Sequence, residues 1–110
     1  MQPTVQITTT IDSEQAAEQI ATALVGRRLA ACVQIVGPVR STFRWEGKIE
    51  ISPEWMCIIK TAADRADDVQ SAIRELHGYD VPEILVTPVT GGNRGYLDWV
   101  HSETRAADSQ

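Results

Sequence analysis

Two helix-forming segments, each set between strand-forming segments, constrain this chain more than any other feature of its sequence. Val5–Thr10 is rich in β-branched residues and alternates apolar with polar positions, which predicts a strand. Asp12 is then the expected N-cap of a helix, with Gln15 in capping-box register. Apolar residues recur at helical spacing up to a predicted stop at Gly26. The apolar face comprises Ala17, Ile20, Ala21 and Leu24. The chain therefore starts with a strand and an amphipathic helix.

The middle of the sequence predicts a long bent hairpin. Leu29–Val36 is almost wholly apolar, which is typical of a strand covered on both faces. Gly37-Pro38 is expected to interrupt this strand, and the extension resumes with alternating polarity up to a turn at Gly47. Pro53 is expected to break the returning arm of the hairpin. Trp55–Thr61 then predicts a further central strand.

A second helix, a fourth strand and a short last helix follow. Asp64 is the expected cap of the second helix, which is predicted to stop at Gly78. Its apolar residues are Val69, Ala72, Ile73 and Leu76. Pro82–Val89 predicts a strand that its two prolines confine to a sheet edge or to its own ends. Tyr96–Val100 predicts a short helix, and a frayed tail is expected from about Thr104.

This order of elements predicts an α+β fold of the ferredoxin-like type, β-α-β-β-α-β, with a long β-hairpin and a short C-terminal helix. A length of 110 residues is that of one domain, residues 1–110. Both helices would cover one face of an antiparallel sheet. Because the central strands read as buried on both sides, the other face is expected to meet another subunit.

Composition and charge disfavour several kinds of partner. Ten Lys and Arg against fifteen Asp and Glu give a formal net charge of -5, so the surface field repels polyphosphate and no nucleic-acid binding is expected. No apolar run approaches the roughly 18–20 residues that cross a bilayer. The segment Met1-Gln2-Pro3 lacks the basic start of a secretory signal. We therefore expect a cytoplasmic protein that does not bind membranes.

The sequence offers little equipment for catalysis. It has no Gly-rich phosphate loop, no GxSxG elbow and no HExxH motif. Its two cysteines, Cys32 and Cys57, follow no CxxC spacing, which disfavours both a disulfide framework and a zinc cage. The chain is therefore not expected to be an enzyme.

Three separated segments are similar to those of one known family. They are Leu29-Ala30-Ala31-Cys32-Val33, then Trp45-Glu46-Gly47-Lys48-Ile49, then Tyr79-Asp80-Val81-Pro82-Glu83-Ile84 with Tyr96-Leu97-Asp98-Trp99. In this order and spacing the chain resembles the CutA family of divalent-cation tolerance proteins. The resemblance implies a ferredoxin-like subunit in a tight homotrimer, with an architecture similar to that of PII signalling proteins. It also implies a part in tolerance of copper and other divalent cations, and no established reaction.

The chain departs from the family pattern at two places. Gly78 stands where the family commonly has a proline, which loosens the loop beside His77. Some members carry a thiol in the first strand, and Val5–Thr10 has none. A metal site taken over from those members would lack that soft ligand.

Cys32, His77 and Glu83 are the candidate metal ligands. Thiol, imidazole and carboxylate groups bind copper and other divalent cations. We therefore expect the chain to bind such a cation, although no cofactor is required. Each residue also has a structural interpretation. Cys32 is typical of a small packed hydrophobe, and His77 would be favoured by the dipole at the end of its helix.

A second candidate site is a cleft between subunits, lined by Lys60, Tyr79, Trp45 and Glu83. A carboxylate in the otherwise apolar segment around Glu83 must be paired or exposed, and Lys60 is its expected ion-pair partner across the sheet. The cleft would hold a small anion or a metal. Two functions stay open: a homotrimer that binds divalent metal, with copper first, and a PII-like trimeric sensor or scaffold for a small molecule or a partner protein.

Overall fold

The computed structural model describes residues 3–105 of the chain and has an α+β fold. The elements are β1 (Thr4–Ile11), α1 (Glu14–Gly26), β2 (Cys32–Trp45), β3 (Lys48–Ala62), the 3-10 turn η1 (Ala63–Arg65), α2 (Ala66–Leu76), β4 (Leu85–Val89) and α3 (Arg94–Glu103). The four strands form one antiparallel sheet in the order β2-β3-β1-β4. No helix of these residues is long and apolar enough to cross a membrane.

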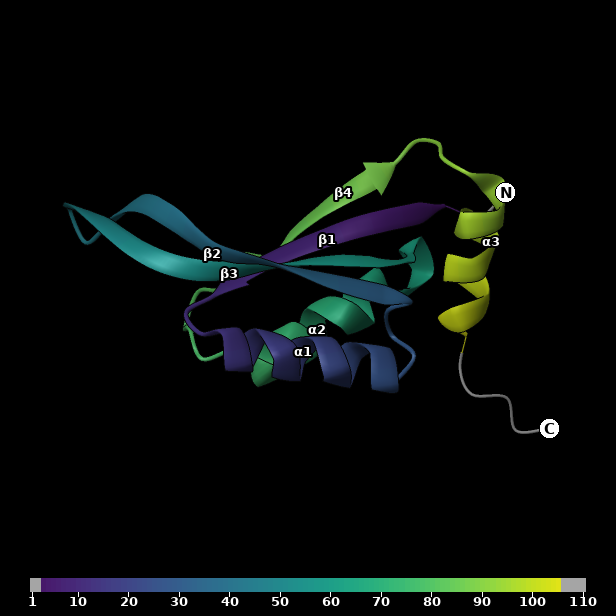
Figure 1. Cartoon of the computed structure of the whole chain (residues 1–110), viewed down its shortest axis with the longest axis horizontal. Helices are drawn as coiled ribbons and strands as arrows, with labels where there is room; N and C mark the ends of the chain where they lie inside the picture. Colours follow the sequence, from purple (N-terminus) through teal and green to yellow (C-terminus); the bar gives the residue numbers. More distant parts are fainter. Residues whose placement is uncertain (1–2, 106–110) are drawn as a thin grey trace.

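One face of the sheet carries the core. Figure 1 shows α1 and α2 side by side beneath the sheet, with α3 at the end where β1 begins. Ile7 of β1 lies opposite Ile59 of β3, and both side chains are fully buried. Directly opposite residues point to the same face, so this pair lies on the face that the helices cover. Ile20, Leu24 and Ile73 are the large helical side chains buried against it.

The β2–β3 hairpin extends beyond the helices and makes the molecule long, with principal extents of 51 × 29 × 21 Å. We call residues 39–53 the arm and the other described residues the body. The structure describes every residue of the arm and none of them is buried. The large exposed apolar side chains of the arm are Phe43, Trp45, Ile49 and Ile51. The arm therefore has no core of its own within one chain.

The prolines of the hairpin do not interrupt its strands, which corrects the sequence prediction. β2 runs unbroken through Gly37-Pro38, and only the register shifts between Val36 and Val39. β3 likewise continues through Pro53. β1 pairs with β3 only as far as Trp55, so Pro53 lies where β3 has a single neighbour. Proline has no backbone N–H to donate, and it is tolerated where one side of the strand has no partner.

The apolar run Leu29–Val36 is also only partly a strand. Leu29 and Ala30 donate their backbone N–H groups to the carbonyl of Leu24 and so close the end of α1. β2 begins at Cys32 and is an edge strand of the sheet with mostly half-buried or exposed residues. The prediction of a strand covered on both faces is therefore wrong for one isolated chain.

Both predicted helix caps are displaced by neighbouring residues. Ser13, in an extended conformation, caps α1 by accepting the Ala16 N–H at 3.0 Å, in place of Asp12. The turn η1 precedes α2, and the N-cap residue Arg65 makes no side-chain cap bond. The carboxylate of Asp64 binds elsewhere, as described below.

In the C-terminal part, the strand and the helix begin and end at other residues than the sequence predicts. β4 begins at Leu85 instead of Pro82, so of the two prolines it contains only Pro88. Among the described residues it pairs with β1 alone, at an edge of the sheet as predicted. α3 runs to Glu103. Thr104, expected to start a frayed tail, is fully buried and donates its hydroxyl to the Val100 carbonyl at 2.9 Å. Residues 106–110 of the expected tail lie outside the described residues.

Candidate functional site

His77 and Glu83 both contact Thr10, the next-to-last residue of β1. β4 pairs with β1 so that Leu85 lies opposite Thr8, and Glu83, two residues earlier, therefore falls beside Thr10. The Thr10 hydroxyl donates to Glu83 Oε1 at 3.5 Å, while the Thr10 carbonyl lies 2.7 Å from His77 Nε2. Two of the three predicted metal ligands thus share one threonine.

The imidazole of His77 has a hydrogen bond on each nitrogen. The Tyr79 backbone N–H donates to Nδ1 at 3.1 Å. A backbone N–H can only donate, so Nδ1 carries no proton, and Nε2 must carry the proton that reaches Thr10. The side chain is buried, at 9% exposure, and its ring centroid lies 4.6 Å from that of Tyr79. The neighbours therefore assign one neutral tautomer.

Tyr79 links this group to the base of the arm. Its hydroxyl donates to Glu54 Oε2 at 2.7 Å, and Glu54 is 7% exposed. Burial raises the pKa of the Tyr79 phenol well above its usual range, and the Glu54 carboxylate adds to the effect. The phenol is therefore a permanent donor to a buried carboxylate. We call this group, Thr10, Glu54, His77, Tyr79 and Glu83, the Thr10 cluster.

Sequence reasoning missed two members of the Thr10 cluster. Glu54 follows a proline at the end of the arm, and only its place beside the apolar segment Trp55–Thr61 indicated that its carboxylate could be buried. Thr10 is one of three consecutive threonines, and its role depends on the β1–β4 register. Neither residue carries a motif that could have identified it.

Lys60 lies at the opposite end of β1 from the Thr10 cluster. It pairs with Gln6 of β1 and Cys32 of β2, and its Nζ donates to Gln34 Oε1. Gln6 and Thr10 are four residues apart, about 13 Å at the usual rise of a strand. Within one chain Lys60 is therefore too far from Glu83 for the predicted ion pair. Its side chain instead bonds Gln34 on the neighbouring strand β2.

Cys32 belongs to the same end of the sheet as Lys60. Its half-buried thiol lies beside the Tyr96 hydroxyl of α3, and burial, with a smaller contribution from Cys32, raises the pKa of that phenol. Within residues 3–105, no three His, Cys, Asp or Glu side chains come close enough together to hold a metal ion. Cys32, His77 and Glu83 of one chain therefore do not fit copper or another divalent cation.

The four predicted cleft residues lie in three places. Tyr79 and Glu83 belong to the Thr10 cluster, whereas Lys60 is at the α3 end of the sheet. Trp45 is the last residue of β2, at the far end of the arm, and is 51% exposed. One chain thus supplies parts of a cleft without assembling them.

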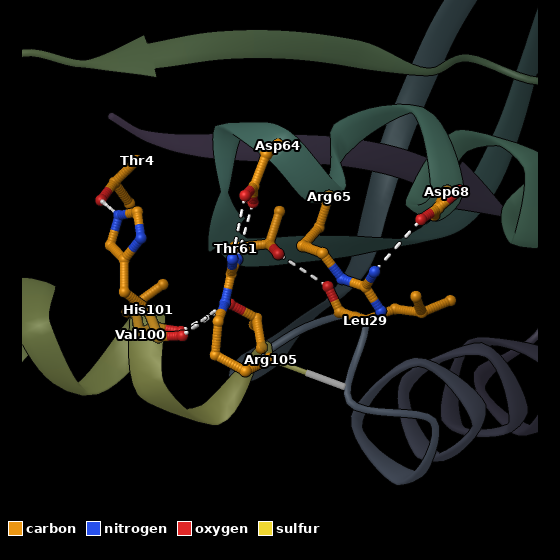
Figure 2. Close-up of polar contacts among 10 residues, drawn as sticks. Thr4, Leu29, Thr61, Asp64, Arg65, Asp68, Val100, His101 and Arg105 are labelled. Carbon is orange, nitrogen blue, oxygen red and sulfur yellow. Dashed lines mark hydrogen bonds and ion pairs between the residues drawn. The ribbon is translucent and has the colours of Figure 1, made fainter. Parts of the chain in front are cut away.

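The sequence also did not indicate how α3 is attached to the rest of the molecule. Figure 2 shows the Arg105 guanidinium on the two carboxylate oxygens of Asp64, at 2.6 and 2.9 Å. The hydrogen bond from Arg105 lowers the pKa of the Asp64 carboxyl. His101 of α3 is half-buried, with Nε2 3.1 Å from the Thr4 hydroxyl. The two contacts fix α3 against the start of β1 and against η1.

Comparison with known proteins gives consistent matches along the chain. The family model described as CutA1 divalent ion tolerance protein matches residues 5–103. The divalent-cation tolerance protein CutA of Thermus thermophilus is 42% identical over 95 residues, which are 86% of this chain and 92% of that protein. The chloroplastic protein CutA 1 of rice is 36% identical over 103 residues, 94% of this chain and 58% of that protein. The chain thus spans little more than half of the plant relative.

Solved structures agree with these sequence matches. The crystal structure of CutA1 from Oryza sativa superposes with a TM-score of 0.92 at 35% identity, over 96% of each chain. The divalent cation tolerance protein of Thermus thermophilus superposes with a TM-score of 0.90 at 39% identity, over 93% of this chain and 99% of that one. With a family model that spans nearly all the described residues and relatives above 30% identity, this chain belongs to the CutA1 divalent ion tolerance family.

Proposed function

We propose that this chain acts as a homotrimer that binds a divalent cation, with copper as the first candidate, in metal-ion homeostasis. The printed names of its relatives describe divalent-cation tolerance for those proteins. The observation that carries the proposal is the separation of the candidate groups in one chain. Cys32 lies at one end of the sheet, and His77 and Glu83 lie at the other. A site that uses both ends needs more than one copy.

The arm supports assembly. Four large apolar side chains on a two-stranded ribbon are more than a lone soluble chain usually leaves exposed in one place. A hollow at the base of the arm could hold part of a neighbouring copy. It is lined by Pro38, Val39, Arg40, Ile51 and Pro53. β2 and β4 also leave unpaired edges that a second copy can extend. We propose a ferredoxin-like subunit in a trimer whose arms are covered by neighbouring copies.

The cation would be bound where subunits meet. Glu83 is exposed, and among residues 3–105 its side chain accepts one hydrogen bond, a long one from Thr10, so its carboxylate retains acceptor capacity. The Cys32 thiolate of another copy would add a sulfur ligand, which copper sites combine with harder ligands. When bound, the cation would link two copies of the chain, because each copy would supply one of its ligands. Cytoplasmic location and the lack of enzymatic activity stay predictions.

Calorimetric titration of the metal-stripped protein with copper tests the proposal. We expect stoichiometric binding to the trimer that is lost in Glu83→Ala and weakened in Cys32→Ser, which lacks the soft ligand. Glu18→Ala, an exposed carboxylate on α1, is the matched control and should bind as the unaltered protein does. Weak binding that survives both site substitutions would contradict the proposal.

A small-molecule sensor is the second candidate function. The position of the Lys60 ammonium group favours it. This ammonium lies on the face of the sheet away from the helices, since Lys60 is adjacent to the core residue Ile59. A cationic group on that face suits an anion held between subunits. Stabilisation by inorganic phosphate or a small dicarboxylate that Lys60→Met abolishes, without any change in the copper titration, would favour the sensor.

A further inference from the structure

We infer that His77 is a positioning residue and not a cation ligand: it holds the segment 78–83 so that Tyr79 reaches Glu54 and Glu83 reaches Thr10. The inference deepens the proposed function and rests on it only for the part of Glu83 as a ligand. The contacts of the His77 ring carry it.

Binding a cation through Nδ1 would cost the contact that shapes the turn. A neutral imidazole has one in-plane lone pair, on the nitrogen without the proton. In His77 this nitrogen is Nδ1, and it faces the Tyr79 N–H at 3.1 Å. A cation on Nδ1 would displace that N–H and leave it without its acceptor.

Binding through Nε2 would cost both contacts together. The proton would have to move to Nδ1, where it would face the Tyr79 N–H, a donor against a donor. The lone pair of Nε2 would then face the Thr10 carbonyl at 2.7 Å, an acceptor against an acceptor. The ring is also 9% exposed, so little of it is open to a cation from solvent.

The same contacts explain what the side chain does. His77 is the C-cap of α2, and its backbone N–H donates to the Ile73 carbonyl at 2.8 Å. Its ring ties the following turn to β1. Gly78 gives this turn wide conformational freedom, which the ring restricts. One residue thus joins α2, the turn and β1, and it sets where the carboxylate of Glu83 stands.

Nitrogen-15 NMR of the imidazoles tests the assignment directly, because the chain has only two histidines. His101→Asn leaves His77 as the single imidazole, which assigns its signals, and in the unaltered chain His101, at the other end of β1, is the control histidine. We expect the signals of an acceptor Nδ1 and a protonated Nε2, and no shift of either when Zn²⁺ is added. The opposite tautomer, or a zinc-dependent shift of His77, would overturn the inference.

Two substitutions separate positioning from ligation. The oxygen of His77→Asn can accept the N–H two residues along, as in an Asx-turn, whereas His77→Ala loses both ring contacts. We expect His77→Ala to weaken zinc affinity about 10–100-fold, the range for groups that orient a ligand, and His77→Asn to recover part of it. The Tyr79 amide should exchange with solvent faster in His77→Ala and be slowed again in His77→Asn.

The outcomes distinguish this inference from the proposed function. If the unaltered protein binds no zinc or copper, the proposed function fails, and the Tyr79 amide alone decides about His77. Unchanged amide exchange in His77→Ala would overturn the positioning role whatever the cation does. Equal loss of cation binding in both variants, with Tyr79 still protected, would also overturn it, because that pattern belongs to a ligand.

Discussion

Two isoleucines of the same strand show how the body and the arm differ. Ile59 and Ile51 both belong to β3, yet Ile59 is fully buried and Ile51 is 64% exposed. At Ile59 the strand has β1 and β2 as neighbours and helices over one face, whereas at Ile51 it has only β2. The two residues have the same side chain and lie on the same strand, so the neighbouring elements decide how far each is buried. The body supplies its own cover, whereas within one chain nothing buries the residues of the arm.

Ile59→Ala should have the largest effect, because the body must keep its core whatever the state of assembly. Removing a fully buried isoleucine costs about 2–5 kcal/mol of unfolding free energy, through lost transfer energy and the cavity left behind. Urea unfolding followed by circular dichroism measures it. A loss below about 1 kcal/mol would mean that the region of Ile59 is far less tightly packed than described.

Ile51→Ser tests the arm on the same strand. If a neighbouring copy covers Ile51, its substitution removes up to about 1.5–3 kcal/mol from association and leaves the fold of each chain intact. Dilution series by light scattering should show earlier dissociation, with unchanged far-ultraviolet circular dichroism. Val25→Ser, an exposed apolar residue on α1, is the matched control. Equal dissociation in the two variants would remove the special role of the arm.

Tyr79→Phe tests the contact at the junction of the two regions. The substitution removes the donor to Glu54 and leaves a buried carboxylate with one partner fewer, at a cost of about 1–3 kcal/mol. Thermal unfolding of single and double variants with Glu54→Gln measures the coupling. Additive losses would show that the bond between the two residues contributes nothing.

Asp64→Asn should have the smallest effect, since the Arg105 pair is exposed. Such pairs contribute about 0.2–1 kcal/mol. Because Arg105 lowers the folded pKa of Asp64, this contribution is complete above the ordinary carboxyl pKa of 3.8 and is lost as the pH falls through the folded value. Stability curves of the two proteins should therefore converge in acid. A difference that grows on acidification would contradict the assignment.

The sequence predicted the elements of the body better than their junctions. The period of Ala17, Ile20 and Leu24 specified α1, because burial of one helical face leaves a pattern in the chain. The cap moved by one residue, from Asp12 to Ser13, since both side chains can accept a backbone N–H and only local geometry selects between them.

The candidate site was predicted only in part, for a physical reason. Glu83 was identified because a carboxylate is unusual in an apolar segment, and His77 because imidazole is a common metal ligand. Tyr79 belongs to a segment that resembles the CutA family. The partner assigned to Glu83 was wrong within one chain, because strand register decides which residues face one another. Register depends on contacts distant in sequence, and composition near Glu83 carries no record of Thr10 or Glu54.

Sedimentation equilibrium of the unaltered chain at micromolar concentration measures whether copies of the chain assemble. We expect a mass of three copies, the proposed trimer, in which neighbouring copies cover the arm and bring the separated candidate groups together. A mass of one copy over the whole concentration range would contradict it, since the exposed apolar side chains of the arm would then have no partner to cover them.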